Sequence, residues 1–128
     1  MSMGFLDQFR KTRDSDIHED WKVIESETQL QAAIEESFEK PVVLFKHSVS
    51  CGISGGVKYG LEKDWDFTAD DLSFYYLDLL SFRPISNKIA NDLGVMHQSP
   101  QVVLLKNGKA VFNASHHAIS VSALRNYV

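Results

Sequence analysis

Several features are scarce in this chain, and each scarcity limits what the protein can be. Its 128 residues include one cysteine, Cys51, so no disulfide bond can form within the chain. No run of apolar residues approaches the roughly 18 that cross a bilayer, so no transmembrane helix is expected. The first residues lack a basic stretch followed by an apolar one, so we expect no secretory signal and, by default, a cytoplasmic location.

Basic residues are also in the minority. Lys and Arg number 13 against 17 Asp and Glu, which gives a net charge of −4 at pH 7. An acidic chain is not attracted to phosphate backbones or anionic headgroups. We therefore expect neither nucleic acid nor a membrane as a partner.

The remaining composition is that of an ordinary soluble protein, with 44% hydrophobic and 23% charged residues. A chain of 128 residues has the usual size of one domain. We expect residues 21–128 to form this domain and residues 1–20 to be an N-terminal extension. Phe5, Leu6 and Phe9 have helical spacing, which is compatible with a short helix in the extension.

From residue 21 onward, apolar runs alternate with helical patterns. Strands are predicted at residues 21–24, 42–45, 73–78, 101–106 and 109–114, and helices lie between the first four and after the last. Asn107-Gly108 is a strong signal for a two-residue hairpin turn. The order predicts an α/β fold with a central mixed β-sheet and helices on both faces.

Cys51 lies just after the buried strand predicted at residues 42–45 and just before a predicted helix. The carboxyl ends of strands are where open α/β sheets usually hold their functional groups. The first turn of a helix has unpaired N–H groups and a partial positive charge, and both stabilise a thiolate. We therefore expect the pKa of Cys51 to lie below the free value of about 8.5 and Cys51 to be the nucleophile.

Ser54 stands where a Cys-x-x-Cys pair would have its second thiol. A serine cannot attack a mixed disulfide and release the product, but its hydroxyl can donate a hydrogen bond to the Cys51 sulfur. Local bonding of Ser54 to the backbone is an equally good interpretation. The pair Cys51 and Ser54 therefore predicts chemistry with a single thiol, the second thiol coming from outside.

The roles of other polar residues near the expected site have more than one interpretation. His47 and Lys46 could lower the pKa of Cys51 electrostatically, although Lys46 could equally lie on the surface. Asp78 ends a strand, where a buried carboxylate near a reactive cysteine can act in proton transfer, but contact with water is the simpler interpretation. His116 and His117 form a weak metal-binding signal, because one histidine pair has no cysteine at a fixed spacing. We therefore expect no metal site.

Ser99-Pro100 opens the strand at residues 101–106. A proline at this point can be cis, and it is expected to be so in the fold considered next. Such a proline packs against the active cysteine and leaves the backbone of Ser99 free to pair with an extended thiol substrate. Ser99, Pro100 and His47 are therefore the expected substrate-binding residues.

Two segments carry a resemblance to a known family. The loop at residues 45–54, with Lys46-His47-Ser48 before Cys51, and the Ser99-Pro100-Gln101 strand start resemble the YtxJ family of monothiol, bacilliredoxin-like proteins. The resemblance covers roughly residues 20–128. It implies a thioredoxin-like fold and a Cys51 that exchanges a bacillithiol mixed disulfide, in cell redox homeostasis or a stress response.

The same resemblance implies the partners and cofactors. Bacillithiol would be a co-substrate, thiol-modified proteins would be the macromolecular substrates, and no tightly bound cofactor is expected. The family loop typically has proline after the cysteine, whereas this chain has Gly52, which loosens the first helical turn.

Two alternatives stay open. Cys51-Gly52-Ile53-Ser54 is one residue from the Cys-Gly-Phe-Ser of monothiol glutaredoxins, which carry an iron–sulfur cluster between two subunits. Their glycine pair has no counterpart at residues 106–109, so this alternative ranks second. The third is a thioredoxin-like binding module with no catalytic activity, in which Cys51 is a core residue.

Overall fold

The computed structural model describes residues 12, 14 and 16–128, and the short helix considered for the extension falls mainly outside this part. The sheet and the helices follow the predicted order. The elements are β1 (Lys22–Val23), α2 (Glu27–Glu36), β2 (Val42–His47), α3 (Gly52–Asp64), β3 (Ser73–Asp78), α4 (Arg83–Leu93), β4 (Gln101–Lys106), β5 (Lys109–Ser115), the 3-10 turn η1 (His116–Ala118) and α5 (Val121–Arg125).

The five strands form one mixed sheet in the order β1-β3-β2-β4-β5. The strands β1, β3 and β2 are parallel, β4 is antiparallel to β2, and β5 is antiparallel to β4. The crossover helices explain the parallel half, and the tight hairpin explains the antiparallel edge. The predicted α/β fold with a mixed sheet is confirmed.

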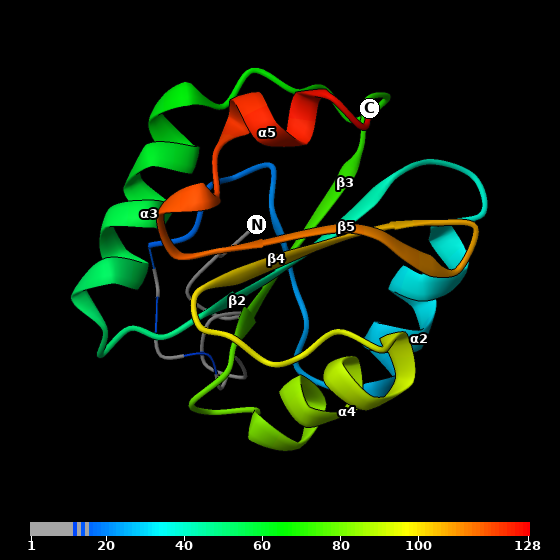
Figure 1. Ribbon diagram of the computed structural model, residues 1–128, viewed down its shortest axis with the longest axis horizontal. Coiled ribbons are helices and arrows are strands. Elements are labelled where there is room, and N and C mark those ends of the chain that lie inside the picture. Colours follow the sequence, from blue (N-terminus) through cyan, green and yellow to red (C-terminus); the bar gives the residue numbers. More distant parts are fainter. Residues whose placement is uncertain (1–11, 13, 15) are drawn as a thin grey trace, which may run out of the picture.

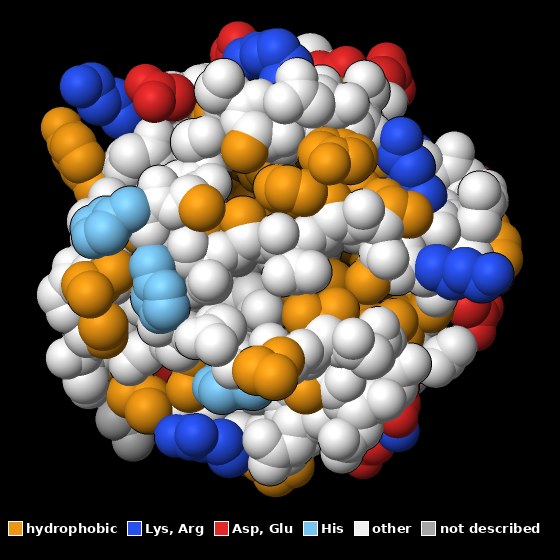
Figure 2. Space-filling view, viewed as in Figure 1, with side chains coloured by type: hydrophobic (Ala, Val, Ile, Leu, Met, Phe, Trp, Pro, Cys, Tyr) orange, Lys and Arg blue, Asp and Glu red, His pale blue; other side chains and the backbone are white. Residues whose placement is uncertain are grey.

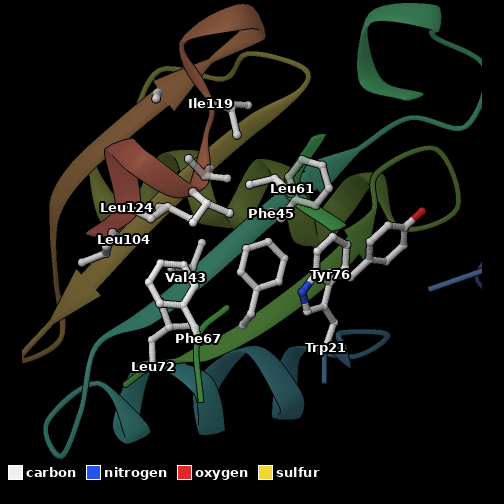
Figure 3. Packing of buried hydrophobic residues seen from close by; sticks show 14 of the residues in the cluster. Trp21, Val43, Phe45, Leu61, Phe67, Leu72, Tyr76, Leu104, Ile119 and Leu124 are labelled. Atoms are coloured by element: carbon white, nitrogen blue, oxygen red, sulfur yellow. The ribbon is translucent and has the colours of Figure 1, made fainter. Parts of the chain in front are cut away.

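Alternating side chains divide the interior into two layers. Val43 and Phe45 of β2 point to the layer that α3 and α5 cover, and Val42 and Leu44 point to the layer of α2 and α4 (Figure 1). Figure 3 shows Phe45 and Tyr76 side by side in the first layer, near Trp21. The rings of Phe45 and Tyr76 meet edge to face, and their centroids are 6.1 Å apart.

Local signals set several boundaries. Ser26 caps α2 by accepting a hydrogen bond from the Gln29 N–H at 3.1 Å. The helix ends at Glu36, and the next residue, Ser37, is its C-cap and also holds the hairpin turn. The Ser37 carbonyl accepts the Asn107 N–H, and the Ser37 hydroxyl accepts the Gly108 N–H, both at 2.8 Å.

One edge of the sheet gathers the segments expected to form the site. Lys46 of β2 and Gln101 of β4 are register partners, and the strands run in opposite directions. The loop that leaves β2 toward Cys51 and the loop that enters β4 through Pro100 therefore lie next to each other (Figure 1). No helix in the described part of the chain is long and apolar enough to cross a membrane.

Candidate functional site

Cys51 is the N-cap residue of α3. Its backbone is extended, with φ −106° and ψ 121°, and its carbonyl accepts the first helical hydrogen bond from the Gly55 N–H at 3.1 Å. The Cys51 N–H donates to the Ser48 carbonyl at 3.1 Å, which closes the turn after β2. The side chain is partly exposed, so its sulfur can meet another molecule.

Groups of the first helical turn lower the pKa of Cys51. The backbone N–H of Ser54 has the largest effect, and the N–H of Ile53 and the hydroxyl of Ser54 add to it. The partial desolvation of the sulfur opposes them. Lys46 and His47 do not contribute, so the electrostatic effect considered for them is replaced by these local donors. A thiol with this environment is favoured as a thiolate.

Ser54 lies directly beneath the loop that carries Cys51. Its side chain is fully buried, and its hydroxyl also accepts a weak hydrogen bond from the Ser48 N–H at 3.4 Å. The Ser54 hydroxyl thus bonds to the backbone, and it is also one of the groups that lower the pKa of Cys51. The sequence contains no second cysteine that could attack a disulfide on Cys51.

The peptide bond between Ser99 and Pro100 is cis, as the fold led us to expect. The Pro100 carbonyl accepts a hydrogen bond from the His116 N–H at 3.1 Å, which joins η1 to this loop. His117 of the same turn lines a hollow of about 460 Å³ together with Gly52 and Ile53. The structure therefore brings the histidine pair to the site, which sequence spacing could not show.

His47 is buried beneath α3, with 2% of its surface exposed. Burial lowers its pKa to about 4, so the imidazole is neutral at pH 7. Its Nε2 lies 3.9 Å from a carboxylate oxygen of Asp14, and its Nδ1 has no hydrogen-bond partner among the described residues. Contact between His47 and substrate stays a prediction.

Asp14 is a residue near the site that sequence analysis missed. Its carboxylate accepts a hydrogen bond from the Tyr76 hydroxyl at 3.2 Å and lies 3.4 Å from Nζ of Lys58 on α3. Burial is the main cause that raises the pKa of Tyr76, and the charge of Asp14 adds to it. Asp14 sits in a polar segment without periodicity, so no sequence signal indicated this contact.

Lys46 and Asp78 are both fully buried. The surface position considered for Lys46 and the contact with water preferred for Asp78 are therefore wrong. Lys46 reaches His97, with Nζ 3.1 Å from Nδ1. The Asp78 carboxylate accepts hydrogen bonds from residues just after it in the chain. One oxygen accepts from the Leu80 N–H at 3.2 Å, and the other accepts from the Ser81 hydroxyl at 3.1 Å. Asp78 therefore shapes the turn before α4.

Known proteins resemble this chain in sequence and in fold. The sequence model of the monothiol bacilliredoxin BrxC family matches residues 22–124. A solved structure described as a candidate oxidoreductase with a thioredoxin fold is 34% identical, with a TM-score of 0.72, over 84% of this chain and 92% of that one.

Two thioredoxins show the same fold at lower identity. The thioredoxin of Malassezia sympodialis is 24% identical, with a TM-score of 0.63, over 83% of this chain and 85% of that one. The thioredoxin of Fasciola hepatica is 20% identical, with a TM-score of 0.61, over 82% and 93%. The predicted thioredoxin-like fold and the resemblance carried by the loop around Cys51 are confirmed. The chain therefore belongs to the monothiol bacilliredoxin family and has a function in thiol redox chemistry.

Proposed function

We propose that this protein is a monothiol disulfide oxidoreductase that takes a low-molecular-weight thiol, such as bacillithiol, from mixed disulfides on other proteins. Cys51 is the nucleophile. The observation that carries the proposal is its position at the N-cap of α3, where Ser54 and Ile53 lower the pKa of a partly exposed thiol. Membership in the monothiol bacilliredoxin family supports bacillithiol as the co-substrate.

The reaction is an exchange of one disulfide for another. The Cys51 thiolate attacks the sulfur of the small thiol, a new S–S bond forms, and the substrate protein leaves as a thiolate that takes up a proton. No net oxidation occurs in this step. A second small thiol then attacks the disulfide on Cys51, which regenerates the thiolate and releases a small-molecule disulfide.

Ser54 determines what happens after the first step. A second thiol three residues after Cys51 would attack the mixed disulfide within the protein, whereas a hydroxyl cannot. The adduct on Cys51 therefore persists until an external thiol arrives. Ser99, beside the cis Pro100, is proposed to pair its backbone with the substrate during the first step.

The test is transfer of the adduct, followed by intact mass. The protein is incubated with a peptide whose cysteine carries bacillithiol, at a pH where the Cys51 thiolate is populated. We expect the mass of one bacillithiol to appear on the protein and to remain until free thiol is added. In Ser54→Cys the adduct should be lost without added thiol, and an internal disulfide should appear.

Cys51→Ser is the control and should take up no adduct. Absence of adduct on the wild-type protein would overturn the proposal. Anaerobic reconstitution with iron and sulfide separates the iron–sulfur carrier, which would give a chromophore and a dimer that Cys51→Ala loses. An inert thiol with an unshifted pKa would favour the binding module instead.

A further inference from the structure

A buried lysine stands beside the candidate site with an unusual partner. Lys46 has none of its surface exposed, and its Nζ lies 3.1 Å from Nδ1 of His97. Among the described residues, no carboxylate pairs with this ammonium group, and its burial alone lowers its pKa, to about 8. Lys46 is therefore still mostly protonated at pH 7, and a neutral imidazole solvates it.

This contact determines which nitrogen of His97 carries the proton. An ammonium group can only donate hydrogen bonds, so Nδ1 must offer its lone pair. The Ser86 hydroxyl lies 3.3 Å from the same nitrogen and can donate to it as well. A neutral imidazole that accepts at Nδ1 carries its hydrogen on Nε2. Lys46 therefore makes His97 a hydrogen-bond donor at Nε2.

The Nε2–H group of His97 has no acceptor among the described residues. The side chain is half-buried, and Nε2 bonds to no described residue and is not one of the buried nitrogen atoms that lack a partner. Burial, Lys46 and Arg83 lower the pKa of His97, in that order, so the ring stays neutral at pH 7. The donor is thus available to a ligand.

Positive charge surrounds this donor. The charges that act on His97 are those of Lys46 and Arg83, and both are cationic. Arg83 is the first residue of α4, so its charge lies at the N-terminal end of that helix, and Figure 2 shows that histidine and basic side chains both reach the surface on this face of the molecule. An N–H donor in a positive field prefers an anionic acceptor, because the hydrogen bond is then charge-assisted. The net charge of the whole chain is −4, so two cationic residues acting on one imidazole are a local feature.

His97 and Lys46 lie close in the chain to Ser99 and Cys51, the two residues expected to meet the substrate thiol. His97 precedes Ser99 by two residues on the loop that enters β4, and Lys46 precedes Cys51 by five on the chain that leaves β2. Lys46 and Gln101 are register partners, so both loops start from the same point of the sheet. Gln101 holds the loop as well, since its Nε2 donates to the Met96 carbonyl at 3.0 Å.

We propose that His97 recognises a carboxylate on the small thiol that Cys51 receives, and that Lys46 is the positioning residue that turns its Nε2–H toward this carboxylate. This inference rests on the proposed function, because it concerns the group transferred to Cys51. It adds a specificity: thiols with a carboxylate are preferred over uncharged thiols, and uncharged thiols over cationic ones.

The test compares three mixed disulfides of one peptide cysteine, made with 3-mercaptopropionate, 2-mercaptoethanol and cysteamine. Second-order rate constants for transfer of each small thiol to Cys51 are measured by intact mass. The readout is the ratio of the 3-mercaptopropionate rate to the 2-mercaptoethanol rate, compared between variants, so intrinsic differences between the thiols cancel. We expect the ratio to fall about tenfold in His97→Leu and in Lys46→Met, which is the loss of one charge-assisted hydrogen bond.

Two further variants separate recognition from support of the fold. His97→Gln keeps an acceptor and a donor on one side chain and should retain part of the preference. Lys88→Met removes a lysine from the exposed surface of α4 and should leave the ratio unchanged. Nitrogen-15 NMR of the wild-type protein should show His97 protonated at Nε2, and Lys46→Met should populate the other tautomer.

The outcomes distinguish the two proposals. Failure of all three adducts to reach Cys51 would overturn the proposed function itself. Transfer with a ratio that stays the same in His97→Leu would overturn the recognition by His97 alone. A wild-type His97 protonated at Nδ1 would contradict the role given to Lys46.

Discussion

Ser54 acts on Cys51 with two of its groups at once: its backbone N–H and its hydroxyl both lower the pKa of the thiol, and the N–H has the larger effect. Ser54 stands where a resolving thiol would be. It therefore stabilises the Cys51 thiolate, but it cannot attack a disulfide on Cys51. The N–H belongs to the helix and would remain after most substitutions at this position, whereas the hydroxyl would not.

Ser54→Ala should raise the pKa of Cys51 without restoring its ordinary value, because the N–H groups of Ser54 and Ile53 remain. The pH dependence of the alkylation rate with iodoacetamide measures this pKa. Ser50→Ala, a change at an exposed serine of the same loop, is the control. A pKa unchanged in Ser54→Ala would mean that the hydroxyl has no effect on the thiolate.

Gly52→Pro should stabilise the protein by about 0.4–1 kcal/mol, because proline reduces the conformational entropy of the unfolded chain. Gly52 is the first residue of α3, where proline is favoured, and a Cβ there meets nothing within 4 Å. The preceding Cys51 has the extended backbone that proline requires. The Gly52 N–H does not contribute to the lowered pKa of Cys51, so that pKa should stay low.

Gly55→Pro is the matched control for this change. It removes the N–H that bonds to the Cys51 carbonyl, so it should destabilise the protein by about 3 kcal/mol. Urea unfolding of both variants gives the free energies. A loss of stability in Gly52→Pro would show that the first turn of α3 needs the freedom of glycine.

Lys46→Met should stabilise the protein at pH 7, and the gain should shrink as the pH rises. Burial lowers the pKa of Lys46 from 10.5 to about 8, so between these values the unfolded chain holds a proton that the folded chain has released. Stability of the wild-type protein therefore rises with pH through this window, by an amount on the order of 3 kcal/mol from this residue alone.

The measurement is the difference in free energy of unfolding between wild type and Lys46→Met at several pH values from 7 to 9.5. Subtraction removes the contributions of other titrating groups. Lys88→Met, at a partly exposed position, should show no such dependence in this range. A difference that does not vary with pH would mean that Lys46 titrates normally in the folded state.

Gly108→Ala should destabilise the protein more than Gly94→Ala. Both glycines have positive φ, +77° and +67°, where an alanine is strained by about 1 kcal/mol. A Cβ at Gly94 meets nothing within 4 Å, but one at Gly108 lies 2.8 Å from Cζ of Phe38. Thermal unfolding measures both costs, and Phe38→Ala in the Gly108→Ala background should remove the excess. Equal costs would show that the exposed Phe38 ring moves aside freely.

The features that sequence analysis predicted correctly depend on neighbours along the chain. Ser26 caps the helix that begins next to it, Asn107-Gly108 turns its own hairpin, and Cys51 lies between a strand and the helix that follows. In each of these the responsible atoms lie within a few residues of one another, so composition and spacing contain the information.

The features that it missed depend on contacts across the fold. Lys46 and His97 are 51 residues apart in sequence, and Asp14 reaches Tyr76 across 62 residues. Neither pair has a periodicity or a short motif, because the sheet register and the path of the N-terminal segment bring them together. The burial of Lys46 has the same origin: polar residues follow it along the chain, but in the fold it lies between β3 and β4 and contacts His97.

The contact between Asp14 and Lys58 has a consequence for shortened versions of the protein. The family match begins at residue 22, so Asp14 lies ahead of it, yet its carboxylate faces the Lys58 ammonium and the Tyr76 hydroxyl. A fragment trimmed to residues 22–124 would leave the nearly buried Lys58 with Glu62 as its acidic neighbour among the described residues. Proteolytic removal of the N-terminal extension would thus change the charge environment of Lys58 on α3, although the cut lies outside that helix.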